Sequence, residues 1–310
     1  MNFIPEEREE NSPYLQLLMI ACYATLGIVI GSVLSILVFM GMHGIGAIGK
    51  LADMANGDPA YVNSMKISQV LNTAFLFILP ALWLARQEKI KLTSFYGFKR
   101  PNGSLLFLVF LIMVFSSPLM EWIALANQKM ILPDFLKPIQ DWMREKEDQA
   151  MKMTILLLKT RGIFDFIINL LVIAVLPAIS EELLFRGAIQ RTFTRMFANP
   201  HVAIWISAFI FSAIHMQFFG FFPRLLLGAG FGYIYWWTGS LWYAMFAHFL
   251  NNAYAVCVSW YMQIHHISLT EADSTANFKW YGYLISLLLT ILLFIYFKHK
   301  NTPHNGKQLG

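Results

Sequence analysis

The sequence predicts an all-α, polytopic membrane protein. Of its 310 residues, 57% are hydrophobic and only 13% are charged, whereas about a quarter of the residues in a soluble domain are charged. Aromatic residues account for 15%, with nine Trp and twelve Tyr, and such rings are enriched at membrane interfaces. Several apolar runs reach the roughly 20 residues that a helix needs to cross about 30 Å of hydrocarbon.

About eight apolar runs are predicted to form transmembrane helices. They lie near residues 15–42, 67–86, 104–126, 164–185, 202–218, 222–238, 241–262 and 280–297. The breaks after the fifth and sixth runs, "FFGFFP" and "WWTGS", are short and therefore predict tight hairpins. Because these breaks separate the runs poorly, seven spans are the alternative.

Polar segments connect the predicted spans at residues 43–66, 87–103, 127–163 and 263–279. The third segment is the longest, and it mixes charged residues with Trp142, Met143 and Met151. This composition fits either a helix that lies on the membrane surface or a solvated helical loop. The whole chain is expected to form one membrane domain, residues 1–310. Its parts are the N-terminal helices and loops (1–163), the core helices (164–262), and the last loop, span and tail (263–310).

Basic residues favour an orientation with both ends of the chain in the cytoplasm. The 87–103 segment and the tail carry Lys89, Lys91, Lys99, Arg100, Lys298, Lys300 and Lys307. With eight spans these two segments lie on one side, and cytoplasmic loops are rich in Lys and Arg. The 127–163 segment carries comparable positive charge on the other side, which weakens the contrast. The net charge of +5 fits contact with anionic headgroups, and no stretch predicts a nucleic-acid site.

The N-terminal segment, the two cysteines and a pair of glycines also carry predictions. The acidic start "MNFIPEEREENSP" and the long run after it predict a first membrane span rather than a cleavable signal peptide. Cys22 and Cys257 lie inside apolar runs and are expected to pack there, without a disulfide or a metal cluster. Gly228 and Gly232 stand four residues apart, a spacing that lets helix backbones approach closely.

Glu181, Glu182 and Arg186 follow directly on an apolar run, in the segment "LPAISEELLFRGAIQR". A charged side chain at the centre of a bilayer costs about 2.5–3.5 kcal/mol, so it is rare unless paired or functional. On a helix, Glu182 and Arg186 share a face and can pair, whereas Glu181 points about 100° away. Glu181 is then free to face a cavity and act as a base, although a charge cluster in water would also explain the pattern. Pro177 is expected to start or kink this segment.

Two later helical runs also carry polar residues. Phe211 and His215 share a face in "FIFSAIHMQ". His248 and Asn252 share a face in "LWYAMFAHFLNNAY". Each run alone fits structural hydrogen bonds between helices. Together with Glu181, they predict that three helices converge on one buried polar cavity. A base, a group that orients water and donors for an oxyanion are what hydrolysis requires.

The three motifs together resemble those of the CPBP family of intramembrane proteases. They are, in order, E-E-x-x-x-R (Glu181, Glu182, Arg186), F-x-x-x-H (Phe211 to His215) and H-x-x-x-N (His248 to Asn252). This family is related to the CAAX-prenyl endopeptidases and to bacteriocin-processing or immunity proteins. The resemblance covers about residues 164–262 and implies a helical bundle around a cavity open towards the membrane interior.

The resemblance also implies an activity and a role for each site residue. The activity is that of an endopeptidase, which hydrolyses a peptide bond of a membrane-associated protein or peptide. Glu181 and His215 would hold and activate water. His248 and Asn252 would form the oxyanion hole, and Glu182 with Arg186 would support the site.

The cofactor requirement is open between two mechanisms. Glu181, His215 and His248 match the ligand set of a catalytic zinc, and the family has been described both as metalloproteases and as metal-free glutamate proteases. The sequence has no HExxH, in which one helix fixes two ligands. Asn252 suits an oxyanion hole better than a zinc site. We therefore expect no cofactor, with a divalent metal such as zinc as the alternative.

Two functions from other classes also fit the sequence. In a proton-coupled transporter, Glu181, His215 and His248 would form a proton relay, but no matching pair of broken helices marks the two halves of the chain. A non-catalytic immunity or scaffold protein of the same fold would have no use for buried acids and donors. We expect a multi-pass protein of the bacterial plasma membrane. Its expected partners are the lipid bilayer and a peptide or protein substrate.

Overall fold

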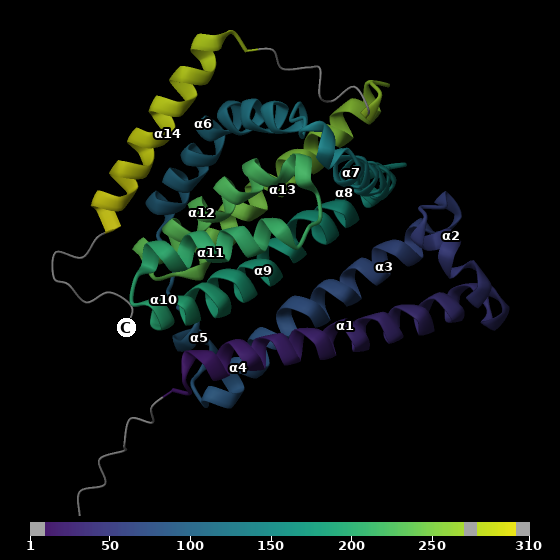
Figure 1. The fold of residues 1–310 in the computed structure, drawn as a ribbon, viewed down its shortest axis with the longest axis horizontal. Coiled ribbons are helices and arrows are strands. Elements are labelled where there is room, and N and C mark those ends of the chain that lie inside the picture. Colours follow the sequence, from purple (N-terminus) through teal and green to yellow (C-terminus); the bar gives the residue numbers. More distant parts are fainter. Residues whose placement is uncertain (1–9, 270–277, 302–310) are drawn as a thin grey trace, which may run out of the picture.

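The computed structural model describes residues 10–269 and 278–301, and every regular element in these ranges is helical (Figure 1). The α-helices are α1 (Pro13–His43), α2 (Leu51–Ala55), α3 (Val62–Thr73), α4 (Leu79–Glu88), α5 (Leu92–Phe95), α6 (Gly103–Gln128), α7 (Lys137–Leu158), α8 (Ile163–Asn169), α9 (Leu176–Glu182), α10 (Arg191–Phe197), α11 (Pro200–Ala213), α12 (Phe221–Thr238), α13 (Leu241–Ile264) and α14 (Trp280–Asn301). The 3₁₀ segments are η1 (Ile45–Lys50), η2 (Pro59–Tyr61), η4 (Asp134–Leu136) and η7 (Phe218–Gly220). The π-helical segments are η3 (Ala74–Ile78), η5 (Leu170–Val175) and η6 (Leu183–Gln190). The predicted all-α class is confirmed.

Polar caps, prolines and a glycine set the ends of several helices. Ser12 accepts a hydrogen bond from the N–H of Leu15 at the start of α1, where Pro13 occupies the first turn. Asn199 caps α11 in the same way, ahead of Pro200. Proline is tolerated there because first-turn N–H groups have no helical partner. α12 ends at Gly239 with a left-handed φ of 58°, which glycine adopts without strain.

Five helical stretches are long and apolar enough to cross a membrane. They are Pro13–His43, Pro59–Glu88, Gly103–Gln128, Ile163–Phe197 and Trp280–Asn301. The other three predicted spans fall on α11, α12 and α13. α11 has 14 residues, which is about 21 Å of helix and too short to cross alone. The protein is therefore a helical, polytopic membrane protein, and the count of eight spans stays a prediction.

The outward faces of the spans are apolar and exposed. On α1, Leu18 and Leu37 point outward, as do Leu292 and Ile295 on α14. Cys22 and Cys257 are also exposed, so the prediction that they pack in the interior is wrong. The physical reason is that the outer face of a membrane helix meets lipid and is as apolar as the interior. An apolar run therefore does not place a cysteine inside.

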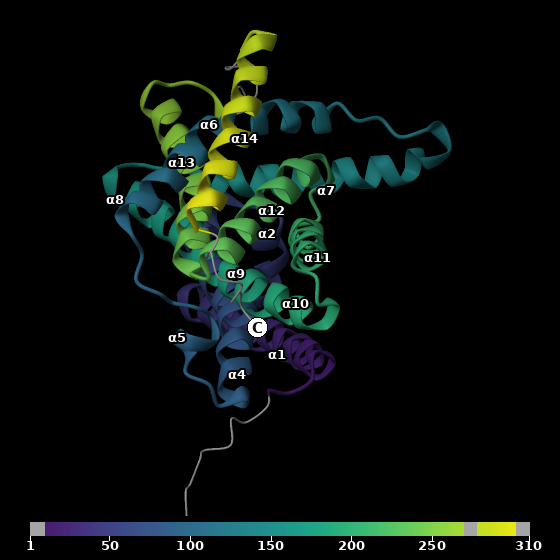
Figure 2. The ribbon, with the colours of Figure 1, turned by 90° about the vertical axis from the view of Figure 1, so that its left-hand side faces the viewer.

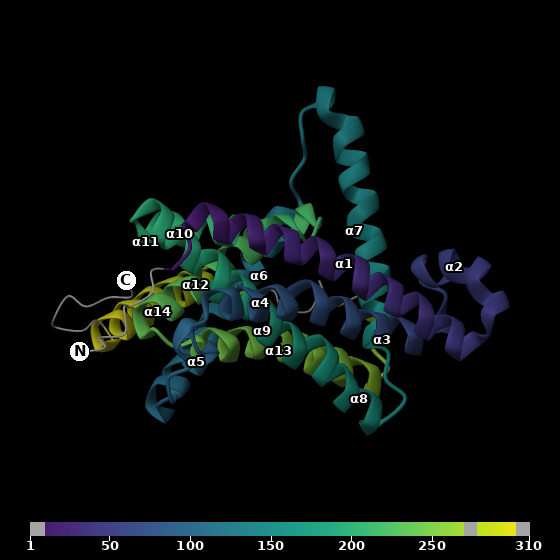
Figure 3. The same ribbon diagram turned by 90° about the horizontal axis from the view of Figure 1, so that it is seen from below.

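The helix that carries both glutamates lies among the later helices of the bundle. Residues 163–197 form one continuous helical rod from α8 to α10. α13 packs along η5 and α9, α11 packs on η6, and α12 packs on α11 and α13. Figure 3 shows α9 and α13 running in a similar direction to α1 and α3. The three motifs thus lie on neighbouring helices, with His215 just beyond the end of α11.

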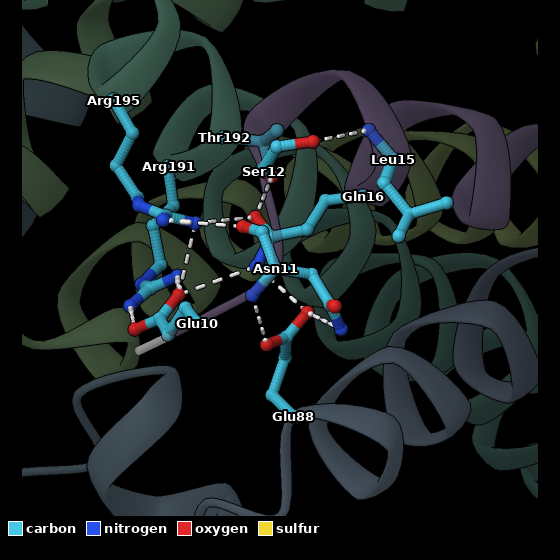
Figure 4. Close-up of polar contacts among 9 residues, drawn as sticks. All are labelled: Glu10, Asn11, Ser12, Leu15, Gln16, Glu88, Arg191, Thr192 and Arg195. Atoms are coloured by element: carbon cyan, nitrogen blue, oxygen red, sulfur yellow. Dashed lines mark hydrogen bonds and ion pairs between the residues drawn. The ribbon is translucent and has the colours of Figure 1, made fainter. Parts of the chain in front are cut away.

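The two ends of this bundle are built differently. At one end the start of α1 meets the end of α4 and α10, where Glu10 forms ion pairs with Arg191 and Arg195 (Figure 4). Beside it, Glu88 accepts hydrogen bonds from Asn11 and Gln16. At the other end, α7 crosses the direction of α1 and extends away from the other helices (Figures 2 and 3).

Candidate functional site

The rod that carries Glu181 and Glu182 is irregular on both sides of them. α9 is flanked by the π-helical segments η5 and η6, and Pro177 stands in its first turn. Because Pro177 has no N–H, the carbonyl of Ile173 loses its usual helical donor. Nδ2 of Asn252 donates to this carbonyl at 3.2 Å. Asn252 thereby ties α13 to the rod about two turns before the glutamates.

Glu182 is completely buried and serves two partners. Its Oε1 atom accepts from Nη1 of Arg186 at 2.6 Å and from Nδ1 of His248 at 2.8 Å. The predicted pairing of Glu182 with Arg186 is confirmed. Arg186 also donates to the carbonyl of Gly228 at 2.8 Å, and its guanidinium lies 4.7 Å from the ring centre of Phe211. These contacts compensate a buried charge, which is costly without a partner.

Glu181, one residue earlier, has different surroundings. It keeps 9% of its surface exposed. Its carboxylate accepts no hydrogen bond from the described residues, and the ion-pair contact within 4 Å is to Nε2 of His248, at 3.9 Å from Oε2. The two adjacent glutamates are therefore inequivalent. Oε1 of Glu182 is held by Arg186 and His248, and its Oε2 is buried without a hydrogen-bond partner among the described residues, whereas the carboxylate of Glu181 accepts no hydrogen bond and keeps some exposed surface.

His248 lies between the two glutamates in a fixed orientation. A carboxylate only accepts hydrogen bonds, so Nδ1 of His248 carries the hydrogen that is donated to Glu182. This leaves Nε2 directed towards Glu181. The imidazole stacks on Phe231, with ring centres 5.4 Å apart, and meets Phe211 edge-on at 5.9 Å. Sequence spacing could not reveal the bond between Glu182 and His248, because it depends on which face of α13 turns towards α9.

His215 lies just beyond the end of α11. Its Nδ1 donates to the carbonyl of Phe211 at 2.8 Å, so Nε2 remains available. The next residue, Met216, adopts a left-handed φ of 52° and turns the chain towards η7. The ring of Phe211 contacts both imidazoles, 5.1 Å from His215 and 5.9 Å from His248. Within the described ranges no hydrogen bond joins His215 to Glu181 or His248.

The three candidate metal ligands do not form a metal-binding group. In residues 10–269 and 278–301, no three His, Cys, Asp or Glu side chains are close enough to hold a metal ion. Glu181, His215 and His248 as placed therefore do not fit a zinc site, and we derive no step through a metal.

Two cavities lie away from the predicted site. One of about 370 Å³ is lined by Gly57, Pro59, Asp148, Met151, Lys152, Ile155, Leu156 and Lys159. The other, of about 110 Å³, is lined by Ser94, Phe95, Gln190, Arg191, Thr194, Arg195, Tyr235 and Trp236. Neither includes Glu181, His215, His248 or Asn252.

Comparison with known families supports the motif assignment. Residues 163–254 match the family model described as type II CAAX prenyl endopeptidase Rce1-like. The predicted family resemblance is confirmed over this segment. The Rce1-like segment contains all six predicted site residues and extends from α8 into α13.

The chain is also similar to an uncharacterised protein, YpbD, of Bacillus subtilis (strain 168). The two are 30% identical over 93 residues, which is 29% of this chain and 44% of YpbD. The match thus spans less than half the length of that protein. No solved structure matches the chain.

Proposed function

We propose that this protein is an intramembrane endopeptidase that hydrolyses a peptide bond of a membrane-associated protein or peptide. The observation that carries the proposal is the contrast between the two glutamates. Glu182 is fully buried and bound to Arg186 and His248, whereas Glu181 is buried except for 9% of its surface, accepts no hydrogen bond from the described residues and faces Nε2 of His248. This arrangement provides an available base beside an oriented imidazole.

In the proposed reaction, Glu181 takes a proton from a water molecule that His215 helps to hold through Nε2. The water oxygen attacks the carbonyl carbon of the substrate and forms a tetrahedral intermediate. The proton then passes to the leaving nitrogen, the carbon–nitrogen bond breaks, and the products are a carboxylate and an amine. A positioned general base contributes typically 10²–10⁴-fold to such a rate.

His248 and Asn252 are proposed to stabilise the oxyanion of this intermediate. Nδ1 of His248 is occupied by Glu182, so the imidazolium form can donate from Nε2. One hydrogen of the Asn252 amide is used on Ile173, and the second is available because an amide has two. Loss of one such donor costs about 2.7–4 kcal/mol of transition-state stabilisation in other hydrolases.

We also propose a class of substrate and a host membrane. The matching family model names CAAX prenyl endopeptidases, so C-terminal prenylated peptides are the first substrates to test. The similar protein YpbD is bacterial, which favours the bacterial plasma membrane.

Product analysis in labelled water tests the proposed function. The full-length protein would be placed in liposomes with a mixture of lipid-anchored peptides in H₂¹⁸O, and the products identified by mass spectrometry. We expect fragments whose new C-terminal carboxylate carries one ¹⁸O atom, and none with empty liposomes. Intact peptides, together with a substrate-dependent pH change inside the liposomes, would instead indicate proton-coupled transport.

A further inference from the structure

The helix α7 lies where several membrane helices begin or end. Nζ of Lys152 donates to the carbonyl of Asn56, shortly before α3. The carbonyl of Leu158 accepts from Asn169, near the start of the 163–197 rod, and from Gln263 at the end of α13. α7 is therefore level with the ends of these spans, which is the depth of a membrane surface.

α7 also runs across the direction of the spans. Figure 1 shows it end-on beside α8 and α13, whereas α1 and α3 run across the view. In Figure 3, α7 is seen along its length and crosses the direction of α1 and α3. A helix that crosses the direction of membrane spans at their common end runs along the membrane surface.

The end of α7 that extends away from the bundle exposes an apolar face. Phe135, in η4 directly before α7, is 80% exposed, and Ile139 and Trp142 on α7 are 49% and 40% exposed. Their spacing of four and three residues places them on one face of a helix. Ile131, in the loop before η4, is also 80% exposed. Asp141, which is exposed as well, lies on roughly the opposite side of the helix.

The outward faces of the neighbouring spans already meet lipid, and the apolar face of α7 continues that contact at their end. We propose that Ile131, Phe135, Ile139 and Trp142 form an interfacial anchor inserted at the boundary between lipid headgroups and acyl chains. Amphipathic helices with Trp, Phe or Leu on the apolar face bind membranes in this position. The anchor does not depend on the peptidase proposal.

The anchor is joined to the loop that follows His215. The ring centres of Trp142 and Phe218 are 5.2 Å apart, and the guanidinium of Arg144 lies 3.3 Å from the ring centre of Phe219. Glu147 accepts a hydrogen bond from the N–H of Phe219 at 3.2 Å. Contact of α7 with lipid would thus help to hold η7, and through it the place of His215.

Spin labelling of the full-length protein in liposomes tests the anchor. In a Cys22→Ser/Cys257→Ser background, nitroxides would be attached at Phe135→Cys and Ile139→Cys, with Asp141→Cys as the matched control on the opposite face. Accessibility to oxygen, which is concentrated in lipid, would be compared with accessibility to a water-soluble nickel complex. We expect labels at 135 and 139 to be several-fold more accessible to oxygen and less to nickel than the label at 141.

Two other results would overturn the proposal. Equal nickel accessibility at all three positions would show that this end of α7 stands in water. Protection from both reagents at 135 and 139, with dipolar broadening between labelled molecules, would show that a second copy of the chain covers the face.

Discussion

Glu181 and Glu182 are adjacent on one helix, and the turn of about 100° between them gives them different partners. Glu182 turns towards Arg186 and His248 in the interior. Glu181 turns towards Nε2 of His248 and keeps part of its surface exposed. The imidazole of His248 thus faces both carboxylates. Glu182 fixes its tautomer by accepting from Nδ1, and Nε2 is left facing Glu181.

Replacing Glu182 by leucine is expected to destabilise the protein by about 3–5 kcal/mol, because the charge of Arg186 would remain buried without its partner. The double variant Glu182→Leu/Arg186→Met removes both charges and should recover much of this loss. Thermal unfolding in detergent would measure both. A double variant no more stable than Glu182→Leu would contradict the pairing as the source of the effect.

The bond from Asn252 to Ile173 predicts a coupling with Pro177. Asn252→Ala should lower the free energy of unfolding by about 1–3 kcal/mol, because the partly buried carbonyl of Ile173 loses its donor. Pro177→Ala restores a backbone N–H near this carbonyl, so the cost of Asn252→Ala should be smaller in that background. Any loss of peptide hydrolysis caused by Asn252→Ala should remain in the Pro177→Ala background, because Pro177→Ala does not replace the Asn252 amide. Equal stability costs in both backgrounds would rule out the coupling.

At this scale, sequence spacing predicts contacts within one helix but not contacts between helices. Glu182 and Arg186 are four residues apart, and their pairing follows from helix geometry alone. The bond from His248 to Glu182 joins residues 66 positions apart, and no periodicity specifies it. The bond from Asn252 to Ile173 had one local signal, Pro177, whose missing N–H frees a carbonyl four residues earlier.

At the scale of whole elements, the rod and α12 are joined by a repeated contact. Arg186 donates to the carbonyl of Gly228 and Gln190 donates to the carbonyl of Gly232. Both pairs are spaced by four residues on their own helices, so the two contacts lie one turn apart. The predicted role of these glycines in close packing is confirmed, since a Cβ at Gly232 would lie 2.6 Å from Oε1 of Gln190.

Gly228→Ala is expected to destabilise the protein by about 1–3 kcal/mol through overpacking. The added Cβ would lie 3.2 Å from Nη2 of Arg186 and 3.2 Å from the ring of Phe211. Gly230→Ala is the matched control on the same helix, because among the described residues its Cβ would meet only Phe294, at 3.4 Å. Thermal unfolding should separate the two variants. Equal melting temperatures for both would contradict this packing.

The apolar runs predict where helices form, but not how regular they are. The short breaks "FFGFFP" and "WWTGS" do separate α11, α12 and α13, as predicted. The π-helical segments around α9 were not predicted, because they depend on Pro177 and on tertiary hydrogen bonds. The prediction that Cys22 and Cys257 pack in the interior was wrong, because hydropathy does not distinguish a lipid-facing side chain from a buried one.

At the scale of the whole molecule, the polar cluster in Figure 4 links the start of α1 to α10, the end of the 163–197 rod. Glu10 pairs with Arg191 and Arg195 on α10, and Arg195 also donates to Gln16. Burial alone would raise the pKa of Glu10, but its hydrogen bonds and the charges of both arginines outweigh burial and hold the pKa below its ordinary value of 4.5.

Because its folded-state pKa is lowered, Glu10 contributes stability that is present above its ordinary pKa and lost as pH falls through the folded-state value. Glu10→Gln should therefore lower the free energy of unfolding at pH 7 by about 1–3 kcal/mol. The difference from the wild type should shrink in strong acid, where both side chains are uncharged. Unfolding curves from pH 7 to pH 3 would measure it, and a pH-independent difference would contradict the ion pairs as its cause.

The overall architecture could be predicted because membrane insertion imposes strong rules on composition and run length. The three motifs predicted a family resemblance, and residues 163–254 match the family model described as type II CAAX prenyl endopeptidase Rce1-like. The order of helices around Glu181 and the position of α7 could not be predicted. Both depend on contacts between segments far apart in the chain, such as Asn169 with Leu158 and Gln263 with Leu158.

The most direct measurement of the central claim is the rate of peptide hydrolysis by the Glu181→Gln variant in liposomes. Asp53→Asn, which removes an exposed carboxylate on α2, is the matched control. With a peptide that the wild type cleaves, we expect Glu181→Gln to reduce the initial rate at least about 100-fold, with an unchanged melting temperature and no effect of Asp53→Asn. A folded Glu181→Gln variant that retains more than about half of the wild-type rate would contradict the role of Glu181 as the base.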